Sequence, residues 1–357
     1  MGIALGLIMK PELDRFIPSI FEYGWNMSVE FLMEKLKMSE KTAKIITETV
    51  ILPIFMEGLE MTYERTKAFT PQRFMDEIQG IADASIVPAH VIMLINQIPE
   101  FLKATCSMIG AWGPSIAPGT ALFQLRALDW AINGPFNDYP LFTVFHPDPV
   151  QVPGSMPFST FGYPGFVGAL TGYSSAPVGI SEKEDAWFGF NGTSTKGYPW
   201  HYVLRDILEF DKDMEAAYKR MFNANKTCSI WVGMADYVIK QFRMVAYGYD
   251  YLEVYNDQDS PIQPRFPGVV YNDPHGYTCM ADLISNVYGN IDANAIINIT
   301  AADNTGFTHV AIYDFLTNYV YLAHTSSEKT PPIVIASLRP YCRVDMNSMW
   351  AEPMPQL

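Results

Sequence analysis

The sequence predicts an α+β protein in which a helical N-terminal third precedes layers of sheet and helix. The chain has 357 residues, of which 49% are hydrophobic and only 17% are charged, so it can bury a large core. Residues 16–67 carry apolar side chains at helical spacing. The remainder groups strands and helices in an order that favours α+β layers over a repeated βαβ unit.

Several helix starts can be recognised in residues 1–105. Ser28 and Ser39 are candidate N-cap residues, because a serine hydroxyl can accept a hydrogen bond from a backbone N–H of the first helical turn. A Thr-Pro pair opens a further helix over residues 72–84, and a Val-Pro pair opens one that runs over residues 88–101. We therefore expect this third of the chain to be helical.

Strand pairs are predicted after residue 103, where the composition changes. Residues 106–113 and 120–130 form a strand, turn and strand, with Gly-Pro and Pro-Gly pairs marking the turn. Further strands are expected at 140–147, twice within 165–181, and at 228–236, 243–255 and 307–325, and helices at 201–209 and 214–224. Asn318 interrupts the last of these strands and marks a hairpin turn, and the Pro-rich residues 257–268 predict a surface loop.

The charge and the cysteine and histidine spacings exclude several classes of function. The formal net charge is −14, so the chain lacks the basic surface that nucleic acid requires. The four cysteines form no CxxC pair, and the six histidines show no HxxxH or HExxH spacing, so no metal site is predicted. One disulfide is possible, and spacing does not select its pair. No apolar run reaches the length of a membrane-spanning helix.

Cys106 is the candidate nucleophile. If residues 106–113 and 120–130 pair as a hairpin, Arg126 and Asp129 return towards Cys106. An arginine beside a cysteine stabilises the thiolate and binds an acyl or carboxylate group, and a nearby carboxylate can accept a hydrogen bond from an α-amine. The alternative is a buried packing cysteine with a surface Arg–Asp pair, since free cysteines are among the most buried residues.

The motifs around these residues resemble the cysteine N-terminal-nucleophile (Ntn) hydrolases. Cys-Ser-x-Ile begins at Cys106, and Leu-Arg-x-Leu-Asp-Trp spans residues 125–130. The pair is similar to the acyl-CoA:6-aminopenicillanic acid acyltransferase-like family (peptidase family C45) and, more distantly, to acid ceramidase and N-acylethanolamine acid amidase. Later segments extend the resemblance over about residues 100–345, namely 165–172, 198–208, 228–236 and 309–314.

The resemblance implies a fold and a mechanism. The fold is an Ntn-hydrolase αββα sandwich over residues 106–357, and residues 1–105 form a helical segment that serves as propeptide or α-chain. Cleavage between Thr105 and Cys106 exposes the Cys106 amine as the local base. Cys106, Arg126 and Asp129 are the catalytic residues: Arg126 stabilises charge at the nucleophile and Asp129 orients the amine. No metal or organic cofactor is needed.

The sequence departs from the family pattern at positions that bear on the oxyanion hole. The family's Arg-Asn-Leu-Asp has Ala127 in place of asparagine, and other asparagines of relatives fall after Gly172 and near Trp231. The oxyanion donors therefore stay open and include backbone N–H groups. A glutamate of the ceramidase branch could match Glu182 or Glu184, with a solvated turn as the alternative for both.

The function expected from the resemblance is an autoprocessing amidohydrolase or acyltransferase acting on the C–N bonds of small-molecule or lipid amides. Two alternatives stay open: a non-catalytic member of this fold that acts as a structural or interaction subunit, and a phospholipase B-like hydrolase of esters. The N-terminal helices are rich in Met, Phe, Ile and Leu, which indicates either a layer packed on the sheet or a surface for peripheral membrane contact.

Four Asn-x-Ser/Thr motifs favour a secretory, lysosomal or extracellular location, as a glycoprotein. They begin at Asn26, Asn191, Asn225 and Asn298. The first residues lack the basic stretch of a signal peptide, so the location rests on these motifs and on the resemblance.

Overall fold

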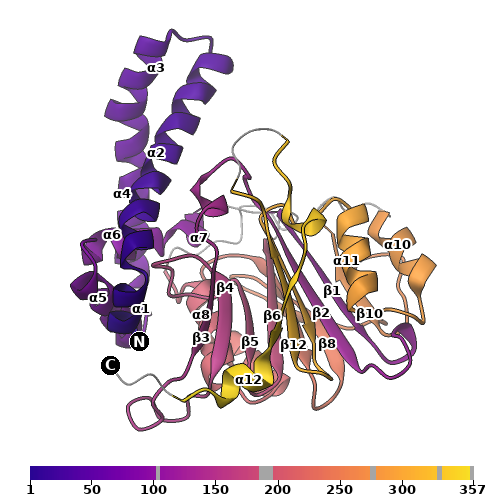
Figure 1. The fold of residues 1–357 in the computed structure, drawn as a ribbon. Coiled ribbons are helices and arrows are strands. Elements are labelled where there is room, and N and C mark those ends of the chain that lie inside the picture. The colour runs from indigo at the N-terminus through magenta and orange to yellow at the C-terminus, as the bar shows by residue number, and fades with distance from the viewer. Residues whose placement is uncertain (102–104, 185–195, 274–278, 328–331, 354–357) are drawn as a thin grey trace.

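Two antiparallel sheets stack face to face in the computed structural model, which describes residues 1–101, 105–184, 196–273, 279–327 and 332–353. Helices cover the outer face of each sheet, and a further group of helices stands beside the sandwich (Figure 1). This arrangement confirms the predicted αββα sandwich with a helical N-terminal segment.

The N-terminal segment is helical, as predicted. Its helices are α1 (Gly2–Ile8), α2 (Lys10–Glu34), α3 (Glu40–Ile46), a π-helical turn (Thr47–Ile51), α4 (Leu52–Thr66), α5 (Gln72–Ala84), α6 (Ala89–Ile95) and α7 (Ile98–Phe101). The helix expected over residues 88–101 is divided into α6 and α7, because Pro99 cannot donate the backbone hydrogen bond that would continue it.

Of the two predicted N-caps, one is confirmed and one is wrong. The Ser39 hydroxyl accepts a hydrogen bond from the Thr42 N–H at 3.3 Å and so begins α3. Ser28 lies inside α2, where its hydroxyl donates to the Gly24 carbonyl at 2.8 Å. A serine hydroxyl can form a hydrogen bond inside a helix as well as at its start, and the Ser28 hydroxyl does so inside α2.

The six-stranded sheet carries the predicted hairpin. Its order is β10 (Val269–Asn272), β1 (Thr105–Trp112), β2 (Leu122–Asp129), β11 (His309–Asp314), β12 (Tyr319–His324) and β13 (Cys342–Asp345). Helices α10 (Cys279–Val287) and α11 (Ala293–Ala302) pack on its outer face. The Asn318 turn is confirmed by its positive φ of 59° between β11 and β12, whereas β10, β13, α10 and α11 were not predicted.

The seven-stranded sheet follows chain order. Its strands are β3 (Leu141–Phe145), β4 (Phe158–Gly162), β5 (Thr171–Ser174), β6 (Val178–Glu184), β7 (Ile230–Asp236), β8 (Gln241–Tyr247) and β9 (Leu252–Tyr255). Helices α8 (Trp200–Phe210) and α9 (Met214–Asn223) cover its outer face. The strand expected over residues 243–255 is two strands, β8 and β9, and β4 was not predicted. A short helix, α12 (Met346–Ala351), follows β13.

The sheets meet through an aromatic and methionine-rich core that includes Met108, Phe161 and Trp231. Gly110 of β1 lets them approach closely. A Cβ atom at this position would lie 1.9 Å from Cγ of Phe242 on the opposite sheet, so only glycine fits without repacking.

One link between the N-terminal helices and the sandwich joins α5 to α8. Arg73 of α5 pairs with Asp206, and Glu77 accepts a hydrogen bond from Arg205 at 3.2 Å. The rings of Phe74 and Tyr202 stack between these pairs with centroids 4.3 Å apart. The contact therefore combines two charge pairs with apolar packing. The Glu77–Arg205 pair is buried, whereas Arg73 is partly exposed.

Candidate active site

The β1–β2 hairpin brings the predicted residues together. Cys106 is paired with Leu128, and Met108 with Arg126. Residues paired across an antiparallel ladder share a face, and so do alternate residues of one strand, so Cys106 and Arg126 lie on the same face of the sheet. Both side chains are fully buried, and Asp129 is 6% exposed. The alternative of a surface Arg–Asp pair is therefore wrong.

Burial dominates the chemistry of Cys106 in the intact chain. It raises the pKa of the thiol to about 12, with the Arg126 guanidinium opposing this effect and the carboxylates of Glu182 and Asp129 adding to it. The thiol is consequently protonated near neutral pH while residue 106 remains in peptide linkage to Thr105.

Arg126 presents hydrogen-bond donors that no described residue accepts. One terminal nitrogen, Nη2, donates to Glu182 Oε2 at 3.3 Å. The buried Nε and Nη1 atoms find no partner in the described part of the chain. An unsatisfied buried donor costs about 1–3 kcal/mol, so these two atoms favour an anionic or carbonyl oxygen as their ligand.

Asp129 is held by a short network on the opposite, outer face. Its Oδ2 accepts a hydrogen bond from Thr305 Oγ1 at 2.6 Å, and its Oδ1 accepts one from the Phe307 N–H at 3.0 Å. The hydroxyls of Ser107 and Thr305 lie 2.7 Å apart. Burial raises the pKa of Asp129, and these hydrogen bonds oppose the increase. The network fixes the carboxylate at the end of β2.

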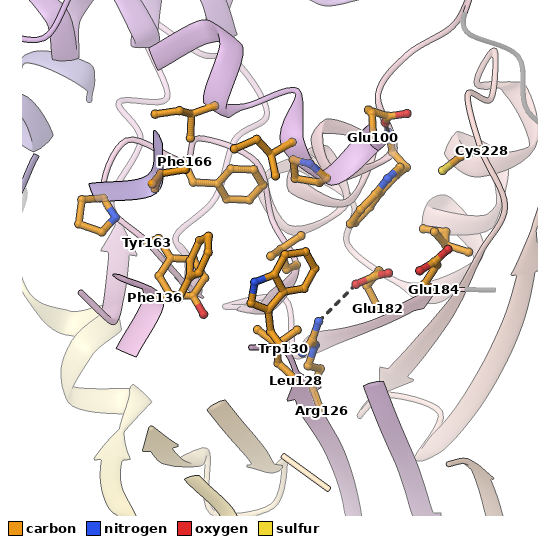
Figure 2. A pocket seen from close by; sticks show the side chains of 18 of the residues that line it. Glu100, Arg126, Leu128, Trp130, Phe136, Tyr163, Phe166, Glu182, Glu184 and Cys228 are labelled. Carbon is orange, nitrogen blue, oxygen red and sulfur yellow. Dashed lines mark hydrogen bonds and ion pairs between the residues drawn. The ribbon is translucent and has the colours of Figure 1, made fainter. Parts of the chain in front are cut away.

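A cavity of about 100 Å³ lies beside this hairpin, with room for about three water molecules. Figure 2 shows Trp130, Phe136, Tyr163 and Phe166 on one side and the glutamates on the other, with Arg126 between them. The lining residues are Phe16, Ile20, Ile95, Ile98, Pro99, Glu100, Arg126, Leu128, Trp130, Phe136, Tyr163, Pro164, Phe166, Leu170, Glu182, Glu184, Trp200, Cys228, Ser229 and Ile230. The cavity is thus closed by the N-terminal helices on one side and by the sandwich on the other.

Two carboxyl groups in the cavity have strongly raised pKa values. Burial raises the pKa of Glu182 to about 7, with Arg126 opposing and Glu184 reinforcing the shift. Burial also raises the pKa of Glu100 to about 7, against the hydrogen bond that its carboxylate accepts from the Trp200 N–H at 2.9 Å. Glu182 is only 5% exposed, so the solvated-turn interpretation is wrong for this residue.

Tyr163 supplies a further donor that the sequence did not indicate. Its hydroxyl is buried in the cavity wall and has no hydrogen-bond partner among the described residues. It lines the same cavity as Arg126, and burial raises the pKa of the phenol while the Arg126 charge opposes the increase. A protonated Tyr163 can therefore donate to an oxygen that also meets Arg126.

Two positions at which the resemblance would place asparagine hold other side chains with other partners. Tyr173, after Gly172, donates its hydroxyl to Asn318 Oδ1 at 2.6 Å, and Trp231 packs between the sheets. His309 also faces the interior, with Nε2 3.0 Å from Thr171 Oγ1. Burial lowers its pKa well below the usual value, so it is neutral. Among the described residues, Arg126, Tyr163 and Ser229 line the cavity and carry buried donors without a hydrogen-bond partner.

Three further sequence questions can be answered for the described residues. The four cysteine sulfurs form no disulfide. No group of three or more histidine, cysteine, aspartate or glutamate side chains in the described ranges is arranged to hold a metal ion. Among the helices that the structure describes, none combines the length and the apolar character needed to cross a membrane.

Two curated proteins of Dictyostelium discoideum are similar to nearly the whole chain. Protein dcd1A is 34% identical over 372 residues, which cover 98% of this chain and 83% of that protein. Protein dcd1B is 32% identical over 378 residues, which cover 99% of this chain and 73% of that protein. No family model matches the chain.

Solved structures are similar in shape over about two thirds of the chain. An N-acylethanolamine-hydrolyzing acid amidase ortholog of Caenorhabditis elegans has a TM-score of 0.44 at 10% identity and covers 67% of this chain and 100% of its own. Penicillin V acylase of Agrobacterium tumefaciens has a TM-score of 0.43 at 10% identity, covering 68% and 86%. A mutant conjugated bile acid hydrolase of Clostridium perfringens has 0.42 at 11%, covering 68% and 93%.

Proposed function

The chain belongs to the family of the Dictyostelium discoideum proteins dcd1A and dcd1B, and we propose that it is an autoprocessing N-terminal-cysteine amidohydrolase or acyltransferase acting on acyl amides. The observation that carries the proposal is that Cys106 shares one face of the β1–β2 hairpin with a buried Arg126, whose Nε and Nη1 atoms have no acceptor among the described residues. A cysteine that only fills space does not require a buried arginine with unpaired donors nearby. A nucleophilic cysteine does, because its attack on a carbonyl creates an oxyanion that such donors stabilise. Membership of peptidase family C45 remains a prediction.

Activation begins at the Thr105–Cys106 peptide bond. The Cys106 sulfur attacks the Thr105 carbonyl carbon, and the C–N bond breaks as the proton of the thiol passes to the leaving nitrogen. The product is a thioester between Thr105 and the Cys106 sulfur, together with a free α-amine on Cys106. Water then hydrolyses the thioester and leaves a Thr105 carboxylate and a Cys106 thiol. This order explains why the intact chain needs no ionised thiol at rest.

The freed amine changes the reactivity of Cys106. An α-amine has an ordinary pKa of about 7.7–8.0, so a useful fraction is neutral near pH 7 and can accept the thiol proton. Asp129, fixed by Thr305 and the Phe307 N–H, orients that amine. The thiolate attacks the substrate carbonyl, the amine component leaves with the proton, and water or another amine resolves the acyl-enzyme.

Arg126 and Tyr163 serve the substrate rather than the thiol. Their free donors, the two guanidinium nitrogens and the phenol, converge on the cavity beside Leu128, the cross-strand partner of Cys106. They stabilise the oxygen of the tetrahedral intermediate, and the loss of one such donor typically slows catalysis by about 10²–10³. The aromatic side of the cavity in Figure 2 receives an apolar acyl group.

The intact mass of the purified chain tests this proposal. After incubation at mildly acidic pH we expect two fragments that divide between Thr105 and Cys106, and no cleavage in Cys106→Ala. Cys228→Ala is the matched control, because Cys228 is also a buried cysteine at the cavity and should leave cleavage unchanged. Cleavage in Cys106→Ala, or persistent integrity of the wild-type chain, contradicts the proposal.

A matched pair of substrates identifies the bond that is cleaved. The processed protein is given an acyl amide and the ester of the same acid, and acid release is measured for wild type and Cys106→Ala. We expect release from the amide that depends on Cys106. Release from the ester alone would instead support a hydrolase of the phospholipase B type.

The proposed location is the secretory route. Asn26, Asn225 and Asn298 all have exposed side chains, so these three acceptor sites are sterically open to glycosylation, and Asn191 lies outside the described residues. Treatment of protein from its natural source with an N-glycosidase should reduce its mass. An unchanged mass would contradict this location.

A further inference from the structure

The connection between α2 and α3 forms a protruding tip, defined here as residues 33–45. Figure 1 shows α2, α3 and α4 extending away from the sandwich, with the tip at their far end. The tip carries four lysines and two glutamates, a net charge of +2, in a chain whose net charge is −14. The basic character is therefore local, and it lies on the most distant part of the helical segment.

Large apolar side chains are exposed among these lysines. Leu36 is 54% exposed between Lys35 and Lys37, and Ile45 is 50% exposed beside Lys44. Lys41, Lys44 and the other tip lysines are exposed as well. Apolar side chains ringed by lysines are typical of surfaces that enter the boundary between lipid headgroups and acyl chains, because lysine stems follow the apolar surface while their ammonium groups reach the headgroups.

The exposure of the tip is built into its fold. Val29, Leu32 and Ala43 form a small core of their own, against which Met38 packs. The Met38 N–H donates to the Leu32 carbonyl at 3.2 Å, while Lys37 adopts a positive φ of 56° that reverses the chain. This turn directs Met38 inward and leaves Leu36 in solvent.

We propose that this tip docks the protein onto membranes that contain anionic phospholipids. The ammonium groups of Lys35, Lys37 and Lys41 meet the lipid phosphates, and Leu36 and Ile45 enter the headgroup region. Lys44 is paired with Glu40 within the tip. The remaining surface carries the acidic excess and is repelled by the same lipids, so electrostatics select the tip as the contact. The inference concerns this surface alone and does not depend on the proposed catalytic activity.

The docked orientation has a consequence for the cavity. Helix α2 carries Phe16 and Ile20 into the cavity wall and ends at Glu34, within the tip. At about 1.5 Å per residue, the helix separates Ile20 from Glu34 by about 21 Å. A docked molecule would therefore hold its cavity about 20 Å from the lipid headgroups.

Flotation with lipid vesicles tests the proposal on the full chain. The vesicles contain phosphatidylcholine with 30% phosphatidylserine, or phosphatidylcholine alone, at about 0.1 M salt. We expect binding to the anionic vesicles that is at least tenfold tighter than to the neutral ones, and that weakens as salt is raised to 0.5 M. Equal binding to both vesicles, or binding to neither, overturns the proposal.

Two tip variants and two controls locate the contact. The triple variant Lys35→Gln/Lys37→Gln/Lys41→Gln and the single variant Leu36→Asp should each weaken binding to anionic vesicles at least tenfold. Lys212→Gln/Lys219→Gln removes exposed lysines elsewhere, and Val150→Asp adds a charge at an 85% exposed apolar residue, so neither should change binding. All four alter exposed residues, and an unchanged melting temperature verifies their folding. Wild-type binding by both tip variants, or equal losses in the controls, contradicts the assignment.

Discussion

The two walls of the cavity differ in what they present to its interior. The wall contributed by the N-terminal helices is almost entirely apolar, with residues such as Ile20 and Ile98, and its one carboxyl group, on Glu100, accepts a hydrogen bond from the Trp200 N–H. The wall contributed by the sandwich contains Arg126 and Tyr163, whose buried donors have no partner among the described residues. The carboxyl group of the helical wall thus has a hydrogen-bond partner, whereas the sandwich wall offers unpaired donors to a ligand.

This difference assigns a separate task to each region. Unsatisfied buried donors are retained where a ligand supplies the missing acceptor, so the proposed reaction belongs to the sandwich wall. The helical wall supplies apolar surface and excludes water. Its buried link to α8, through Glu77 and Arg205, makes it a firmly attached cover.

The largest expected effect comes from removing the donors of the sandwich wall. Arg126→Met should lower kcat/KM for amide hydrolysis about 10³-fold, because the oxyanion loses its cation. It should also reduce the free energy of unfolding by about 3–5 kcal/mol, since Glu182 loses the partner of its buried carboxylate. Steady-state kinetics and thermal unfolding measure the two effects.

The double variant Arg126→Met/Glu182→Gln separates these two roles. Removing both charges should recover most of the lost melting temperature while activity stays low, because no donor returns to the cavity. Recovery of activity in the double variant would show that Arg126 serves only to neutralise Glu182, and the comparison of the walls would then fail.

The attachment of the helical wall is the next largest effect. Glu77→Ala leaves Arg205, which is 1% exposed, with the more distant Glu209 as its remaining acidic partner, and should cost about 3 kcal/mol of unfolding free energy. Glu64→Ala is the matched control, since its pair with Lys67 is exposed and should be worth less than about 1 kcal/mol. Equal melting temperatures for the two variants would mean that buried charges do not hold the cover in place.

Each wall also carries one carboxyl group that makes stability depend on pH. The folded-state pKa values of Glu100 and Glu182 are about 7, above the ordinary value of 4.5. The folded chain thus binds protons more tightly than the unfolded chain between these values. The contribution of these two groups to the free energy of unfolding is fully present below about pH 4.5. It falls as the pH rises towards 7, by up to about 3 kcal/mol per group at 1.4 kcal/mol per pKa unit.

Melting temperatures measured between pH 5 and 8 check this dependence. Glu100→Gln and Glu182→Gln should each make the decline with pH shallower, whereas Glu57→Gln, at an exposed position, should leave it as in the wild type. If neither cavity variant alters the decline of the melting temperature with pH, then Glu100 and Glu182 are not its cause.

The part of the site that lies within one hairpin could be predicted from the sequence. The part that depends on packing between distant segments could not. Cys106 and Arg126 belong to one hairpin, whose turn residues and strand pattern determine the strand pairing, so their approach was predictable, and the observed register places both on one face. Thr305 reaches Asp129 only because β11 lies next to β2 in the sheet, and no local pattern fixes that order. Tyr163 similarly acquires its role from the packing of the sheets and the helices around the cavity.

The strands and the buried glutamate that were not predicted were missed because a local sequence window carries too little information. The missing strands β4, β10 and β13 have four or five residues, so their alternation is too brief to distinguish a strand from a loop. Glu182 was ambiguous because its neighbours are charged, and only the fold shows that its side chain is buried beside Arg126. Burial of a polar residue is decided by its tertiary neighbours, which a sequence window does not contain.

The smallest expected effect comes from shortening an apolar side chain of the helical wall. It tests whether this wall only covers the cavity or also positions the reacting groups. Ile20 lines the cavity and packs in the helical core, whereas Leu13 of the same helix packs in that core and is not among the lining residues. Ile20→Ala should raise KM about tenfold, because part of the surface for the acyl group is lost, and should leave kcat nearly unchanged. Leu13→Ala should lower the melting temperature by a similar or larger amount without changing KM. A fall in kcat for Ile20→Ala would show that the helical wall also positions the reacting groups, and the division of tasks between the walls would no longer hold.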